Sequence, residues 1–208
     1  MKKICLCCLA LLCLTNLFAQ ETVNYKEKKP YKTWVKMAPK LNDEFFKTPE
    51  AIRIGDNVLL YQQTTGGWPK NIYMPAELTE QELEDVLASK DEVNESTIDN
   101  DATSTEIQYL RLYLATHIKK YRDSALDGIR YILKAQYPNG GWPQFWPRPK
   151  GYYTHITYND NAMVNVMELL REVYEKKALM NMSPTASATV LAPHSTKVWR
   201  ASSKRKLS

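Results

Sequence analysis

Apolar residues recur every three or four positions along five stretches of the chain, which is the spacing of one face of a helix. They are Ile52 and Leu59; Leu83, Val86 and Leu87; Ile107, Leu110 and Leu114; Leu126, Ile129, Ile132 and Leu133; and Met163, Val166, Met167 and Leu170. The first helix is predicted to begin near Pro49 and the second after Thr79 as its N-cap, and a break near residues 119–123 separates the next two. No segment alternates with a period of two, so the sequence predicts an all-α fold.

A short motif occurs twice, as TTGGWPKN at residues 64–71 and within YPNGGWPQFWP at residues 137–147. Glycine after a helix can adopt the left-handed conformation that turns the chain, and proline prevents the helix from continuing. Each Gly-Gly-Trp-Pro corner is followed by a long loop and another helix. Helix hairpins that repeat in this way, with loops at one end, suggest an α/α toroid.

The tryptophans of the two corners, Trp68 and Trp142, have two interpretations that the sequence leaves open. Each can cover the exposed end of the preceding helix, which is a structural role. Each can instead stack on a sugar ring, as an aromatic side chain on a loop of a secreted α/α protein often does.

Two triplets of acidic and amide residues precede helices, Asp-Asn-Asp at 99–101 and Asn-Asp-Asn at 159–161. Helix initiation explains part of this pattern, because Asp160 can cap its own helix and Thr103 with Glu106 fits a capping box. In a fold that brings helix ends to one face, the triplets would also collect carboxylate and amide oxygens, which are the ligands that Ca²⁺ prefers. The sequence therefore allows an open Ca²⁺ site that a substrate carboxylate completes.

The histidines give weaker signals. His155 can act as a general base or as a structural histidine bonded to a loop carbonyl, and His117 fits the structural role better because aromatic and aliphatic residues surround it. The chain has no Cys or His cluster with zinc spacing, no Gly-rich phosphate loop and no Gly-x-Ser-x-Gly motif, so these classes of site are not predicted.

Residues 1–19 consist of two lysines, an apolar run and a small residue, which indicates a signal peptide removed after Ala19. We therefore expect a secreted or periplasmic protein. The apolar run is too short for a membrane span, so no membrane association is expected after cleavage. All four cysteines lie in this segment, and the mature chain is expected to have no disulfide.

The formal net charge of +5 is unevenly distributed. Seven of the 28 lysines and arginines lie in residues 1–19 and 178–208, and these two segments contain no acidic residue. Because all 23 acidic residues lie between them, the body of the chain is slightly acidic. Nucleic-acid binding is therefore not expected.

Four motifs, in their order and separation, resemble the family 10 pectate lyases: TTGGWPKN, STIDNDATSTEIQYL, AQYPNGGWPQFWP and GYYTHITYNDNAMVNVM, within residues 34–177. The resemblance implies an (α/α)₃ toroid, de-esterified polygalacturonate (pectate) as substrate, Ca²⁺ dependence and anti β-elimination. By motif, the residues implied to hold Ca²⁺ or to meet the uronate carboxylate are Asp99, Asn100 and Asp160. Together with the interpretations above, the candidate substrate-binding residues are Trp68, Lys70, Asp99, Asn100, Trp142 and His155.

The chain departs from the family pattern after Lys177. In this family the base is an arginine in a motif beyond the second triplet; no such motif is recognisable, so no catalytic residue is assigned. We expect residues 20–177 to be the N-terminal part of the catalytic domain, in a toroid incomplete at its C-terminus. Residues 178–208, with no acid and no helical period, are expected to be a disordered tail. We hypothesise a frameshift after Lys177, which would leave the chain as written inactive.

Two other functions fit parts of the pattern. A non-catalytic protein that binds pectin or other uronates would keep the acidic triplets and tryptophans without the base. A terpene cyclase of the α/α-toroid type would share the sequence AQYPNGGW, which is similar to the Gln and Trp repeats of that group, but its Asp-x-Asp-Asp motif is absent.

Overall fold

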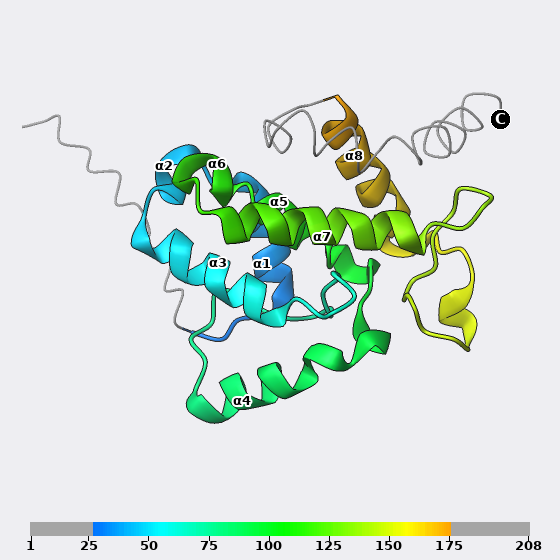
Figure 1. The fold of residues 1–208 in the computed structure, drawn as a ribbon, viewed down its shortest axis with the longest axis horizontal. Helices are drawn as coiled ribbons and strands as arrows, with labels where there is room; N and C mark the ends of the chain where they lie inside the picture. The colour runs from blue at the N-terminus through cyan, green and yellow to red at the C-terminus, as the bar shows by residue number, and fades with distance from the viewer. Residues whose placement is uncertain (1–26, 176–208) are drawn as a thin grey trace, which may run out of the picture.

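The computed structural model describes residues 27–175, which are mostly helical (Figure 1). The α-helices are α1 (Tyr31–Met37), α2 (Asp43–Phe46), α3 (Pro49–Tyr61), α4 (Glu80–Ala88), α5 (Ser104–Tyr109), α6 (Leu112–Thr116), α7 (Lys119–Ala135) and α8 (Ala162–Tyr174). The 3₁₀ turns are η1 (Ala38–Lys40), η2 (Ser89–Asp91), η3 (Val93–Glu95), η4 (Asp99–Asp101), η5 (Tyr152–Thr154) and η6 (Asn159–Asn161). Residues 27–175 contain two isolated β-bridges and no strand, which confirms the all-α prediction.

Helix α7 is the centre of the described fold and packs against α3, α5 and α6 (Figure 1). Its predicted apolar face, which includes Ile129 and Ile132, is fully buried. Helix α8 contacts α5 and buries Val166 and Leu170, as its apolar spacing predicts. None of the helices in residues 27–175 is long and apolar enough to span a bilayer.

Helix α4 lies at the edge of the fold and contacts α3 (Figure 1). Thr79 is its N-cap, as predicted, and forms a capping box with Glu82. The apolar stripe of this helix is not covered by the described residues, since Leu83 and Leu87 are 37% and 49% exposed.

The break between the third and fourth predicted helices lies earlier than the sequence pattern indicated. Helix α6 ends at Thr116, and His117 takes a left-handed conformation with φ of 56°. The hydroxyl of Thr116 donates to Leu112 O (3.0 Å) and accepts from Ile118 N (3.3 Å), so this side chain competes with helical bonding at the turn. Helix α7 then begins at Lys119, inside the predicted break.

The predicted capping box of Thr103 and Glu106 is wrong. Thr103 has a φ of 65° and makes no side-chain cap. Its hydroxyl donates to Thr97 O (2.8 Å) and accepts from Trp68 N (3.0 Å). Glu106 is buried and accepts a hydrogen bond from Trp34 Nε1 (2.9 Å). Both side chains serve contacts between distant segments, which the spacing along one helix does not reveal.

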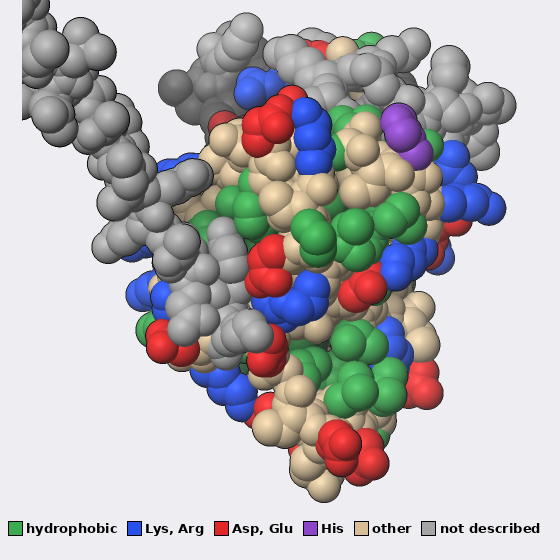
Figure 2. All heavy atoms as spheres, turned by 90° about the vertical axis from the view of Figure 1, so that its left-hand side faces the viewer, with side chains coloured by type: hydrophobic (Ala, Val, Ile, Leu, Met, Phe, Trp, Pro, Cys, Tyr) green, Lys and Arg blue, Asp and Glu red, His purple; other side chains and the backbone are tan. Residues whose placement is uncertain are grey.

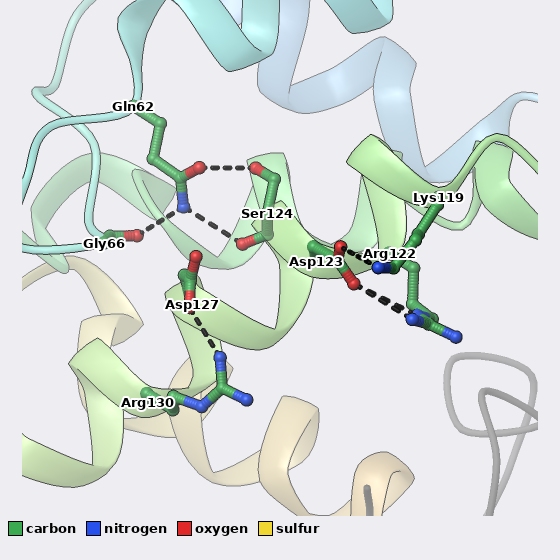
Figure 3. A network of polar contacts seen from close by, with 8 residues as sticks. All are labelled: Gln62, Gly66, Lys119, Arg122, Asp123, Ser124, Asp127 and Arg130. Atoms are coloured by element: carbon green, nitrogen blue, oxygen red, sulfur yellow. Dashed lines mark hydrogen bonds and ion pairs between the residues drawn. The ribbon is translucent and has the colours of Figure 1, made fainter.

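The first Gly-Gly-Trp-Pro corner is attached to α7 by a glutamine (Figure 3). Gln62 Nε2 donates to Gly66 O (2.8 Å) and to Ser124 O (3.0 Å), and Ser124 Oγ donates to Gln62 Oε1 (2.5 Å). Gly66 has a φ of 92°, and a Cβ at this position would lie 2.5 Å from the carbonyl oxygen of Asp127. Glycine is therefore required here by both backbone conformation and space.

The second corner repeats this geometry at the end of α7. Gly140 has a φ of 93°, matching Gly66, and Gln136 Nε2 donates to Gly140 O (3.1 Å). The two corners are thus copies of one structural unit, each closing the helix that precedes it.

Both corner tryptophans are fully buried, at 0% exposure. Trp68 Nε1 donates to Val58 O (2.7 Å) near the end of α3, and Trp142 Nε1 donates to Ile132 O (2.8 Å) near the end of α7. The helix-covering interpretation is confirmed. The expected contact of Trp68 and Trp142 with a sugar is wrong, because neither ring has a face that a ligand can reach.

Figure 2 shows the side of the molecule that lies at the left of Figure 1, where α2 and α6 are found. Apolar side chains form small patches there between charged ones. A groove of about 610 Å³ on α2 and α6 is lined by, among others, Phe46, Lys47, Arg111 and Leu114.

Candidate functional site

Each tryptophan corner holds the start of one acidic turn. The carbonyl oxygen of Trp68 accepts from Thr97 N (3.1 Å), and that of Trp142 accepts from Thr157 N (3.0 Å). In both turns the threonine hydroxyl accepts the N–H two residues further on, at 3.0 and 3.2 Å. The repeated corners therefore position the two acidic triplets, which become η4 and η6.

The two acidic turns share an unusual backbone. Asn100 has φ 52° and ψ 39°, and Asp160 has φ 45° and ψ 36°. The following residues, Asp101 and Asn161, are also left-handed, with φ of 63° and 59°. Asn and Asp tolerate this region better than other residues with a side chain, which explains why the triplets contain only these two types. Such backbone conformations cost free energy in residues with a side chain, and they cluster at functional sites.

The structure places η4 and η6 in contact, and α8 contacts both. Asn165 on α8 donates a hydrogen bond to Asp101, which ties the second repeat to the first. Burial raises the pKa of Asp101; the hydrogen bond from Asn165 opposes this, and the charges of Asp160 and Asp99 add to it. Three carboxylates from the two triplets thus lie close enough to interact.

Asp99 is the most buried of these carboxylates, at 2% exposure. Its Oδ2 forms an ion pair with Lys70, whose side chain is 28% exposed. Its Oδ1 has no hydrogen-bond partner within residues 27–175. A buried carboxylate oxygen without a partner costs free energy, so a ligand that supplied a partner would be bound favourably here.

Asn100 and Asp160 carry further oxygens in the two turns, η4 and η6, that contact each other. Asn100 Nδ2 donates to Asn71 Oδ1 (2.9 Å), which orients the amide. Asp160 is exposed, and its Oδ2 accepts from Asn159 Nδ2 (2.9 Å). Of the three residues with candidate ligand oxygens, Asp99 and Asn100 belong to the first repeat and Asp160 to the second.

His155 lies on the surface, between η5 and η6. Its imidazole makes no hydrogen bond with any residue in the described range, so its expected substrate contact stays a prediction.

Sequence reasoning missed several residues of this region. Asp101 was recognised as part of a triplet, but its bond with Asn165 joins positions far apart in the chain. A cluster of Arg148, Tyr152 and Tyr153 follows the second corner, and only the unusual richness in aromatic residues there could have indicated it.

Within residues 27–175, no three or more His, Cys, Asp or Glu side chains are grouped so as to hold a metal ion by themselves. The predicted Ca²⁺ ligands, Asp99, Asn100 and Asp160, are not such a group, because they include only two carboxylates and one amide.

Comparison with known proteins bears directly on this arrangement. The sequence model of a family described as pectic acid lyase matches residues 62–192. The chain belongs to the pectic acid lyase family. The match includes both tryptophan corners and both acidic turns, and it confirms the resemblance carried by the four motifs. The match continues to residue 192, past Lys177, where the recognisable motifs end. A disordered tail and a frameshift were predicted for residues 178–208, and this segment lies outside the described residues.

Solved structures of the same family share this fold. A family 10 polysaccharide lyase from Cellvibrio cellulosa has a TM-score of 0.56 and 29% identity, over 82% of this chain and 48% of its own. An aspartate-to-alanine variant from the same organism, in complex with trigalacturonic acid, has a TM-score of 0.58 and 28% identity over the same shares. The chain thus spans about half the length of these structures, and the likeness agrees with the expected toroid. A search of curated proteins found no match.

Proposed function

We propose that this chain provides part of the catalytic site of a pectate lyase, which cleaves polygalacturonate by Ca²⁺-assisted anti β-elimination. The observation that carries the proposal is the meeting of η4 and η6 beside Lys70. Membership of the pectic acid lyase family supports the reaction class, and the bound trigalacturonic acid in a structural neighbour supports an acidic sugar as substrate.

The donor set suits Ca²⁺. Asp99, Asn100 and Asp160 offer carboxylate and amide oxygens, and the unpartnered Oδ1 of Asp99 is a buried oxygen that a cation would satisfy. A bound Ca²⁺ would neutralise the substrate carboxylate and stabilise the charge that develops at the adjacent carbon.

Lys70 has two parts in the proposed site. Its ammonium group holds Asp99 in place through their ion pair. It also brings positive charge to a region with three aspartates, so it offsets their repulsion toward an incoming uronate. A polyanionic substrate needs such a counter-charge beside acidic ligands.

The reaction transfers the proton at C5 of a galacturonate to a base and breaks the bond between C4 and the glycosidic oxygen, which takes up a proton and leaves as a hydroxyl, so that a double bond forms between C4 and C5. No pair of acid and base carboxylates, as in a glycoside hydrolase, is required. We assign no residue of this chain as the base. The predicted signal peptide, residues 1–19, lies outside the described residues; on that prediction, we propose that the protein acts in the periplasm or outside the cell.

The proposal is tested by mixing the protein with polygalacturonate and Ca²⁺ and following the ultraviolet absorbance of the unsaturated product. In a chain that carries the family's base, we expect absorbance to rise, EDTA to abolish the rise, and Asp160→Asn to lower the rate by at least about tenfold, since it removes a ligand charge from the site. Glu168→Gln, an exposed change on α8, is the matched control and should keep the wild-type rate.

Two results would contradict this account. A rate that EDTA leaves unchanged would exclude the role of Ca²⁺. Binding of polygalacturonate without any product, by a chain that carries the family's base, would favour the alternative of a non-catalytic uronate-binding protein.

A further inference from the structure

A stack of aromatic rings and a guanidinium group lies on the segment after the second corner. The Arg148 guanidinium carbon lies 4.2 Å from the ring centroid of Phe145 and 4.9 Å from that of Tyr153. The Phe145 and Tyr153 centroids are 5.2 Å apart, and those of Tyr153 and Tyr152 are 3.8 Å apart. The stack therefore runs from the buried Phe145 outward to Tyr152.

This stack adjoins the first acidic turn. Lys70 Nζ, which pairs with Asp99, lies 5.2 Å from the centroid of Phe145. The carbonyl oxygen of Gln144 accepts from Ile98 N (3.1 Å) and from the hydroxyl of Thr97 (2.6 Å). Backbone bonds thus fix the base of the stack to the residues that lead into Asp99.

The outer ring of the stack is exposed. Tyr152 is 68% exposed, although its neighbour in the stack, Phe145, is only 4% exposed. A hydrogen bond with Tyr153 raises the pKa of the Tyr152 hydroxyl, and the nearby charge of Asp99 adds to this. An aromatic ring that is held by others and exposed beside a ligand site has a face for a sugar, and little conformational entropy is lost when it binds.

Arg148 is held against the Phe145 and Tyr153 rings of the same stack. Its Nη2 donates to Glu95 Oε1 (2.7 Å) and its Nε to Asn94 O (3.2 Å). These bonds use Nε and Nη2, so Nη1 remains as a hydrogen-bond donor, and the side chain is 23% exposed. A fixed guanidinium with a remaining donor can bind the carboxylate of an acidic sugar.

We propose that Tyr152 and Arg148 form a separate sugar subsite, in which the Tyr152 ring stacks on a uronate next to the one held at the acidic turns. The inference rests on the proposed function and extends it: the subsite makes longer oligogalacturonates bind more tightly than short ones. Tyr152 supplies the apolar face, and Arg148 selects an acidic sugar over a neutral one.

The test measures binding of galacturonate oligomers of increasing length by calorimetry, in Ca²⁺, and the proximity of sugar protons to tyrosine rings by saturation-transfer NMR. Tyr152→Ala should weaken binding of the longer oligomers about tenfold, the loss of one ring-stacking contact, and should flatten the dependence on length. Tyr152→Phe should bind as the wild type does. Tyr174→Ala is the matched control. Tyr174 is also exposed but lies at the C-terminal end of α8, away from η6, so its replacement should leave oligomer binding and its length dependence unchanged.

The outcomes separate the subsite from the lyase reaction. Unchanged length dependence in Tyr152→Ala would overturn the subsite while leaving the lyase proposal in place. Length-dependent binding that is lost in Tyr152→Ala, together with no unsaturated product from a chain that carries the family's base, would support the subsite and overturn the reaction. A wild type that binds no oligomer of any length would overturn both.

Discussion

Replacing Trp68 with alanine should lower the free energy of unfolding by about 4 kcal/mol, because it removes a large, fully buried side chain from the core. The indole also donates to Val58 O, and a Cβ on Gly128 would lie 2.7 Å from its ring, which shows how closely α7 packs against it. Denaturant unfolding followed by circular dichroism measures the loss. Trp142→Ala should give a loss of similar size, since the second corner repeats the first.

Two further variants test whether the loss of stability comes from the buried volume of the Trp68 ring. Trp68→Phe keeps most of the buried volume and should lose less stability than the alanine variant. Leu87→Ala, at a side chain that is 49% exposed, should change stability by no more than about 0.5 kcal/mol. A Trp68→Ala protein that kept wild-type stability and lost only its affinity for pectate would show that the ring contacts substrate, contrary to its burial.

Glu106→Gln should make the stability of the protein much less sensitive to pH. Burial raises the pKa of Glu106 from 4.5 to about 7, opposed by the hydrogen bond from Trp34. A carboxyl whose pKa is higher in the folded state holds its proton more tightly there, so the wild type loses stability as pH rises from about 4.5 through 7. The loss amounts to about 3 kcal/mol once both states are ionised.

The glutamine variant keeps an oxygen that can accept from Trp34 Nε1 and cannot ionise. It should match the wild type near pH 4.5 and exceed its stability by about 3 kcal/mol above pH 8. Thermal or denaturant unfolding of both proteins across this range gives the difference. Parallel stability curves would mean that Glu106 ionises in the folded protein as easily as in the unfolded chain. Glu50→Gln, at a partly exposed ion pair with Arg53, serves as the control.

The parts of the structure that follow from local sequence were predictable. Helical spacing identified α7 and α8, and the apolar positions of α8 are buried as expected. The repeated Gly-Gly-Trp-Pro corners were visible as repeats, because left-handed glycine and the proline that follows act locally. The acidic triplets were recognisable for a similar reason, since Asn and Asp suit the left-handed backbone of η4 and η6.

The parts that depend on distant segments were not predictable. Thr103 and Glu106 have the spacing of a capping box, but they bond to Thr97 and Trp34 because the fold brings those partners near. The burial of Trp68 likewise follows from α7 packing over it, which the motif alone does not show. Residue type suggested an acidic site; only the tertiary structure joined Asp101 to Asn165 and brought Phe145, at the base of the aromatic stack, against Lys70.

The central claim is that η4 and η6 act as one site, and a double-mutant cycle on Asp99 and Asp160 tests it most directly. Calorimetry would measure Ca²⁺-dependent binding of a galacturonate oligomer to the wild type, Asp99→Asn, Asp160→Asn and the double variant, each checked for folding by thermal melting. If the two carboxylates hold the same ion, the double variant should bind little worse than either single variant, with a coupling of at least about 1 kcal/mol. Losses that add independently would contradict the account, because they would place the two aspartates at separate sites.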